Sequence, residues 1–194
     1  MAGPASMYRR FAASTRGVAA IEFAMILPIL TLLFLASFDG GRAIAIYMKV
    51  RSATYTLGAI TNQYSTIHDT DIQSILGATS VVLAPYSSSP VVVVVSELSI
   101  SAGSQTTATV VWSNTLTGTT VTYTGLAIGS SVTLPTGLAA AGNTCGTYPC
   151  YLIYGKVSYT YTPMFGYFGN GGITLSDSLY VTPRTTTSIT RTSP

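Results

Sequence analysis

One apolar run near the N-terminus limits what this chain can fold into. The 22 residues between Arg16 and Asp39 contain a single charged side chain, that of Glu22. As a helix they rise about 33 Å, enough to cross a hydrocarbon core of about 30 Å. A cleaved secretory signal has a shorter apolar core of roughly 7–15 residues. The run therefore favours a membrane-spanning helix over a cleaved signal, with Pro28 kinking the helix rather than ending it.

Gly17 and Glu22 stand out at the start of this run. Glycine lets a protease approach the backbone closely. An ionisable residue inside a bilayer costs roughly 2.5–3.5 kcal/mol at its centre on insertion scales, which implies a role. The pair indicates a processing and assembly signal. Glu22 is also close enough to the start of the span to reach the lipid headgroups, so a purely interfacial position remains open.

Charge leaves the orientation of the span undecided, because three arginines precede it and three basic residues follow it closely. The long remainder is rich in Ser, Thr and Tyr and holds both cysteines, which is typical of exported protein. Long domains translocate largely regardless of flanking charge. We therefore expect a cytoplasmic N-terminus and a periplasmic or extracellular C-terminal domain.

The composition of the remainder bounds its function. Charged residues make up 8% of the chain, the net charge is +3, and no basic patch for nucleic acid is present in the sequence. About 120 residues follow the helices, enough for one modest core. A surface with so few charges suits a tethered or assembled protein better than a freely diffusing one.

Two helices are predicted. The first runs from Val18 to about Gln63 and is broken or bent near Gly40 and Gly41. Its second half carries an apolar seam that packs either on the chain's own downstream domain, the favoured alternative, or in an intermolecular bundle. The seam is Ile46, Val50, Ala53, Leu57 and Ile60.

Asp69 or Thr70 caps the second predicted helix, which ends at Ala84 and Pro85. Its apolar positions keep roughly one face. They are Ile72, Ile75, Leu76, Thr79, Val82 and Leu83.

From Val91 onward the hydrophobic period changes to two, which predicts strands. We predict a hairpin. The apolar face of its first strand is formed by Val92, Val94, Leu98 and Ile100, and that of its second strand by Ala108, Val110 and Trp112. The valine run 91–95 is either buried on both faces, which is favoured, or an open edge.

The pattern predicts loops and short strands over residues 118–144. It predicts the clearest strand over residues 151–162 and a last strand over residues 173–181. Asp177 lies on the apolar face of that last strand. Either a bulge turns it outward, as we expect, or it accepts hydrogen bonds in a partly buried site.

Catalytic chemistry is sparse. Asp69 and Asp71 near His68 are interpreted as helix-start residues rather than a metal or acid–base cluster. A single histidine cannot build the usual zinc or triad sites, so we expect no enzyme activity, no metal and no cofactor. Cys145 and Cys150 flank a turn-forming spacer and predict a local disulfide in an oxidising compartment; a cytoplasmic domain would keep them reduced.

Residues 16–24, Leu27, Pro28 and residues 39–42 together resemble the N-terminus of TadE-like pseudopilins of the bacterial tight-adherence (Tad/Flp) pilus system. Residues 111–113, 157–163 and 183–184 also resemble that family, while Lys156 stands where relatives often carry an acidic residue. The resemblance implies an α+β fold with a pilin-like long N-terminal transmembrane helix, a second short helix and an antiparallel β-sheet domain.

The resemblance further implies cleavage between Gly17 and Val18 by a prepilin peptidase, and docking of subunits through Glu22 and Phe23. Glu22 would pair with the freed amine of a neighbour's Val18. Implied partners are other pilins and pseudopilins, an inner-membrane assembly platform and lipid, with no nucleic acid and no small-molecule substrate. The predicted parts are a cytoplasmic leader (1–17), the transmembrane and extended helix (18–62) and an exported TadE-like domain (63–194).

Two functions follow. The first is a minor pseudopilin in the inner membrane that helps assemble or initiate a tight-adherence pilus or secretion fibre. The alternative is an unprocessed, membrane-anchored envelope domain that binds a partner protein through its Tyr-rich sheet without entering a filament.

Overall fold

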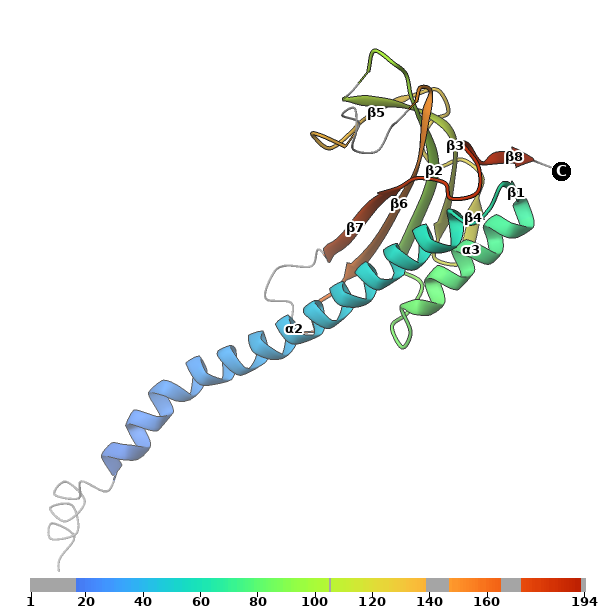
Figure 1. Cartoon of the computed structure of the whole chain (residues 1–194). Helices are drawn as coiled ribbons and strands as arrows, with labels where there is room; N and C mark the ends of the chain where they lie inside the picture. Colours follow the sequence, from blue (N-terminus) through green and yellow to red (C-terminus); the bar gives the residue numbers. More distant parts are fainter. Residues whose placement is uncertain (1–16, 105, 139–146, 165–171, 193–194) are drawn as a thin grey trace, which may run out of the picture. The chain divides into compact units, whose positions relative to one another are not determined.

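The computed structural model describes residues 17–104, 106–138, 147–164 and 172–192 (Figure 1). The chain divides into two compact units, Met1–Arg42 and Ala43–Pro194. The first contributes the N-terminal part of helix α2 (Val18–Thr61), and the second holds the rest of α2, helix α3 (Asp69–Val82) and the strands.

Helix α2 is 44 residues long and includes Pro28, Gly40 and Gly41. The predicted helix is thus confirmed, as is the prediction that Pro28 does not end it. The helix is not broken at Gly40 and Gly41, so of the two predicted alternatives, a break or a bend, the break is wrong and the bend stays a prediction. A glycine inside a helix costs about 1 kcal/mol, and the apolar and helix-forming residues on both sides outweigh two such costs.

The second unit contains an antiparallel sheet ordered β4-β3-β2-β6-β7, with β5 paired to β3. The strands are β2 (Val91–Ile100), β3 (Thr107–Thr117), β4 (Thr120–Thr122), β5 (Ser131–Thr133), β6 (Cys150–Tyr161) and β7 (Ile173–Val181). A separate parallel pair joins β1 (Thr66–His68) to β8 (Thr190–Thr192). The α+β fold class is confirmed.

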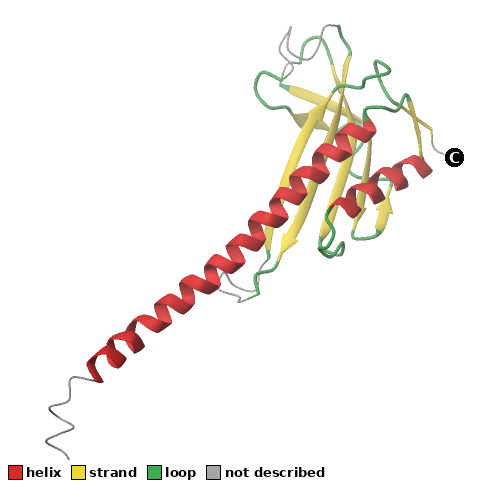
Figure 2. Ribbon diagram, turned by 60° about the horizontal axis from the view of Figure 1, so that its bottom comes forward, coloured by secondary structure: helices red, strands yellow, loops and turns green. Residues whose placement is uncertain are grey.

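Within this unit, α3 and the C-terminal part of α2 lie on the same face of the sheet (Figure 2). The predicted seam of α2 is part of this helix-side core: Ile46, Val50, Ala53 and Leu57 are buried there and Ile60 is partly buried. The favoured alternative, packing on the chain's own domain, is therefore confirmed. Leu57 sits over Gly155 of β6, where an added Cβ would lie 3.1 Å from its Cδ2.

The valine run forms the first half of β2, which is the central strand between β3 and β6. Val91, Val93 and Val95 are fully buried on the helix side, while Val92 and Val94 are half-buried on the other face. Both predicted alternatives are wrong, because the run is neither an edge nor buried on both faces.

A β-bulge divides strand β3 into two phases. Glu97 pairs with Trp112, but Leu98 pairs with Val110, so Val111 is the extra residue. Trp112 consequently belongs to the helix-side core, whereas Val110 and Ala108 belong to a second core with Leu98. The predicted single face of Ala108, Val110 and Trp112 is wrong for this reason.

Strand β7 contains no bulge, since its register with β6 is continuous from Ile173 to Val181. The bulge predicted at Asp177 is therefore wrong. Asp177 pairs with Val157 and is half-buried. The edge strand thus accommodates the carboxylate by leaving it partly exposed.

Candidate functional site

The N-terminal part of α2 exposes almost all of its large apolar side chains. Val18 is 52% exposed, Phe23 is 60% exposed, and Glu22 between them is also exposed. This stretch is the part of the described chain long and apolar enough to cross a membrane, and none of its most apolar window is buried. An exposed apolar surface of this length needs lipid or other helices to cover it.

Gly17 and Val18 stand where the helix begins. Gly17 is exposed, and apart from its own chain neighbours and the adjoining helix backbone no described atom lies within 4 Å of the position that a Cβ would take. Val18 and Glu22 are four residues apart, so they share one helix face. The structure thus brings the predicted cleavage and docking residues together at one end of α2; what they do stays a prediction.

Residues 17–57 match the family model described as TadE-like protein. The chain carries a TadE-like segment. That segment contains Gly17, Val18, Glu22 and Phe23, and it extends into the seam that packs on the sheet. No match was found among curated proteins or among solved structures.

The match covers about a fifth of the chain, so a role in the Tad pilus system stays a proposal for this chain. Its single N-terminal apolar helix fits a single-pass membrane protein. The match ends at residue 57. The resemblance at residues 111–113, 157–163 and 183–184 accordingly stays a prediction.

The predicted disulfide falls partly outside the described residues. Cys150 is the first residue of β6 and is 7% exposed in the second core. Cys145 lies outside the described residues, so the pairing stays a prediction.

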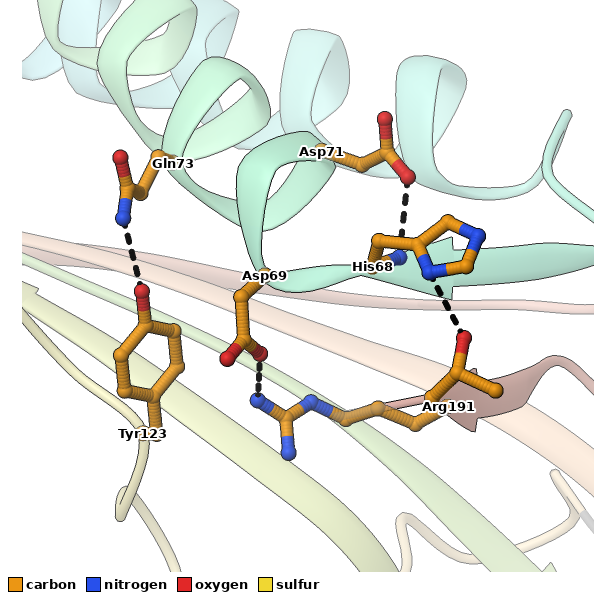
Figure 3. Close-up of polar contacts among 7 residues, drawn as sticks. His68, Asp69, Asp71, Gln73, Tyr123 and Arg191 are labelled. Carbon is orange, nitrogen blue, oxygen red and sulfur yellow. Dashed lines mark hydrogen bonds and ion pairs between the residues drawn. The ribbon is translucent and has the colours of Figure 1, made fainter. Parts of the chain in front are cut away.

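The start of α3 is a polar cluster that ties three segments together (Figure 3). The backbone N–H of His68 donates to Asp71 Oδ2 at 2.9 Å, and Asp69 forms an ion pair with Arg191. The helix-start interpretation of Asp69 and Asp71 is confirmed. The predicted cap is wrong by one or two residues, because His68 is the N-cap and Asp71 satisfies its amide.

Two further contacts complete this cluster. Thr192 Oγ1 and His68 Nδ1 share a hydrogen bond at 2.9 Å, and Gln73 Nε2 donates to the Tyr123 hydroxyl at 2.7 Å. The Arg191 guanidinium lies 5.4 Å from the centre of the Tyr123 ring. Side chains from α3, β8 and the segment after β4 therefore meet at one place.

Sequence reasoning missed Glu97. Its side chain is 1% exposed, and its Oε1 accepts a hydrogen bond from the Ile189 N–H at 2.6 Å. Burial raises the pKa of Glu97 to about 7, against the opposing effects of the Ile189 amide and the Trp112 indole. The available signal was a lone carboxylate inside an apolar strand, which indicates a buried partner.

Proposed function

We propose that the chain is a minor pseudopilin of the inner membrane that helps assemble or initiate a tight-adherence pilus or secretion fibre. The observation that carries the proposal is the coincidence of the TadE-like match with a helix whose first turns expose Gly17, Val18 and Glu22 beside an uncovered apolar surface. The C-terminal domain would lie on the periplasmic side, and the N-terminus would begin in the cytoplasm.

Processing would prepare the helix for assembly. A prepilin peptidase would hydrolyse the peptide bond between Gly17 and Val18, which leaves a free α-amine on Val18. The basic leader, with Arg9, Arg10 and Arg16, would be removed in the same step. The new helix end then carries one positive amine and, one turn later, one carboxylate.

Assembly would use that charge pair between subunits. In a low-dielectric environment a lone carboxylate is costly, and the amine of a neighbouring subunit's Val18 would neutralise that of Glu22. Such a pair also fixes the register of the two helices, as polar groups in helix interfaces do. Phe23 and the other exposed apolar side chains would cover one another or contact lipid. Other pilins and pseudopilins and an inner-membrane platform are the proposed partners.

The first prediction concerns the N-terminus of the mature protein. In cells with an active prepilin peptidase, intact-mass and N-terminal peptide mass spectrometry should find a chain that begins at Val18. A Gly17→Val variant should keep its leader, because a β-branched side chain obstructs close approach of the protease to the backbone. An intact Met1 end in the parent protein would instead favour the unprocessed envelope domain.

The second prediction concerns Glu22. A Glu22→Gln variant should be cleaved and inserted normally but should recover far less of its pilin partners after in vivo crosslinking, because the glutamine cannot neutralise the neighbour's amine. Glu22→Asp keeps the charge and serves as the matched control, with partial recovery expected. Crosslinking of the glutamine variant at the level of the parent protein would contradict the docking role.

A further inference from the structure

Strand β7 forms one edge of the large sheet (Figure 1). It pairs with β6 along its whole length, Ile173–Val181, and no described strand pairs with its other side. Its register contains no bulge and its sequence no proline or lysine, which are features that usually protect an edge. The strand at the opposite edge, β4, is only three residues long. The backbone groups on the free side of β7 are therefore a regular template for one more strand.

The side chains of β7 are only partly covered. Leu175 and Val181 pack against the helix-side core, so alternate positions from Ile173 to Val181 face the helices. All of these positions remain partly exposed. The three valines of β2 that face the helices are, by contrast, fully buried, because β2 has a neighbouring strand on both sides. A strand added to β7 would cover its apolar side chains in the same way.

One flank of α2 lies beside this edge and exposes apolar side chains. Leu179 of β7 lies directly against Gly58 of α2, where an added Cβ would be 2.6 Å from Leu179 Cδ1. The residues that precede Gly58 at steps of three or four share this helix face. They are Tyr55, Arg51, Tyr47 and Ile44, and of these Tyr55 is 57% exposed and Ile44 60%. The helix-side surface next to β7 is thus apolar and uncovered by the described part of the chain.

Asp177 indicates what kind of segment fits this edge. It is the central residue of β7 and forms no ion pair with a described residue. Two copies of β7 paired antiparallel over their whole length would place one Asp177 opposite the other, and like charges at directly opposite positions are destabilising. A lysine or arginine at the opposite position would instead form a favourable pair. The charge therefore favours a different segment over a second copy of β7.

We propose that the free edge of β7 and the adjoining flank of α2 dock an extended segment of another protein, which adds to the sheet as one more strand. The segment carries apolar side chains at the alternate positions that face α2, with a basic side chain among them opposite Asp177. Backbone hydrogen bonds to β7 supply affinity, and these side chains supply selectivity. The site uses none of residues 17–23, so it is independent of the proposed pseudopilin function.

Two synthetic peptides of the length of β7 test the charge. Both alternate valine and threonine, but the central valine is replaced by lysine in one peptide and by glutamate in the other. Binding is measured by the fluorescence anisotropy of labelled peptide with the full chain in phosphatidylcholine nanodiscs, and empty nanodiscs serve as the blank. The lysine peptide should bind about 10-fold more tightly than the glutamate peptide.

Variants of Asp177 assign that preference to one carboxylate. Asp177→Lys should reverse the order of the two peptides, and Asp177→Asn should abolish the difference, whether or not the lysine variant folds. No binding of either peptide, equal affinities for the parent protein, or a preference that survives Asp177→Asn would overturn the site.

N-methylated peptides test the backbone contacts. An added strand turns alternate N–H groups toward β7 and the others away from it. Of two lysine peptides that are N-methylated at odd or at even positions, one should lose binding and the other should keep it. The same result for both would overturn strand addition.

The flank of α2 has a matched test. Ile44→Ser should weaken binding of the lysine peptide about 5-fold, because apolar area that the peptide covers is lost. Ile128, which precedes β5, is 70% exposed, and Ile128→Ser should leave binding unchanged. Equal effects of the two variants would contradict the contact with α2.

Discussion

Leu57→Ala should destabilise the C-terminal unit by about 2–5 kcal/mol, the range seen for large-to-small changes at fully buried sites. Leu57 is 0% exposed and fills the space above Gly155, which has no side chain of its own. Removing it leaves a cavity between α2 and the sheet that neither side can close. The measurement is chemical denaturation of the full chain in nanodiscs, followed by the fluorescence of Trp112 in the same core. The matched control is Met48→Ala on the same helix, since Met48 is 66% exposed and should change stability by less than about 0.5 kcal/mol.

A double variant sharpens this test. Gly155→Ala alone should destabilise, because its Cβ would approach Leu57 Cδ2 to 3.1 Å while the nearest atom of Leu179 stays at 3.8 Å. In the Leu57→Ala background the same methyl enters the empty space, so it should be neutral or stabilising. Contacting residues show coupling energies of about 0.5–3 kcal/mol in such cycles. Additive effects would mean that Leu57 does not pack on Gly155.

The stability of the domain should fall as pH rises through neutrality, opposite to the behaviour of a salt-bridged carboxylate. The pKa of Glu97 is raised to about 7 from 4.5, chiefly by burial, so between these values the folded chain holds a proton that the unfolded chain releases. The stabilising contribution is complete below pH 4.5 and is lost as pH rises through about 7. The shift corresponds to at most about 3 kcal/mol.

The comparison with Glu97→Gln isolates this effect from the other titrating groups. Unfolding free energies of both proteins, measured between about pH 4.5 and about pH 8, should diverge, with the parent protein losing up to about 3 kcal/mol more than the variant. Parallel curves would show that Glu97 is ionised at low pH in the folded chain, and that burial does not control it.

The helices were predictable because their signals are long and redundant. The apolar run and the seam from Ile46 to Ile60 repeat over many turns, and α3 shows the same period between Ile72 and Leu83. The helix is not broken at Gly40 and Gly41 because the cooperative hydrogen bonding of a 44-residue helix outweighs the low helix propensity of two glycines.

The faces of the strands could be predicted only where the alternation of inward and outward side chains continues without a shift. Strand β6 keeps one continuous register with β2 and was predicted to within one residue at each end, whereas the bulge at Val111 moves Val110 and Trp112 into different cores. A bulge leaves no mark on hydrophobic periodicity other than a slip of one residue. Strands β1 and β8 are three residues each, too short for any period to appear.

The contacts of the site depend on pairings that one sequence does not encode locally. Glu97 meets Ile189 across 92 positions, and Asp69 meets Arg191 across 122. Residues 17–23 could be singled out from the sequence because the pattern that they form lies within one short stretch of one helix. The partners proposed for them are in other subunits.

The pairing of β1 with β8 has a consequence for the order in which the domain is completed. Its outermost contact, between His68 and Thr192, closes a loop of 124 positions, so it forms only after nearly all of the domain has been synthesised. Contacts of such long range are late and slow to form. Until then α2, α3 and the sheet must hold together through their buried cores alone. The pairing of β1 with β8 is then added to a domain that is already folded.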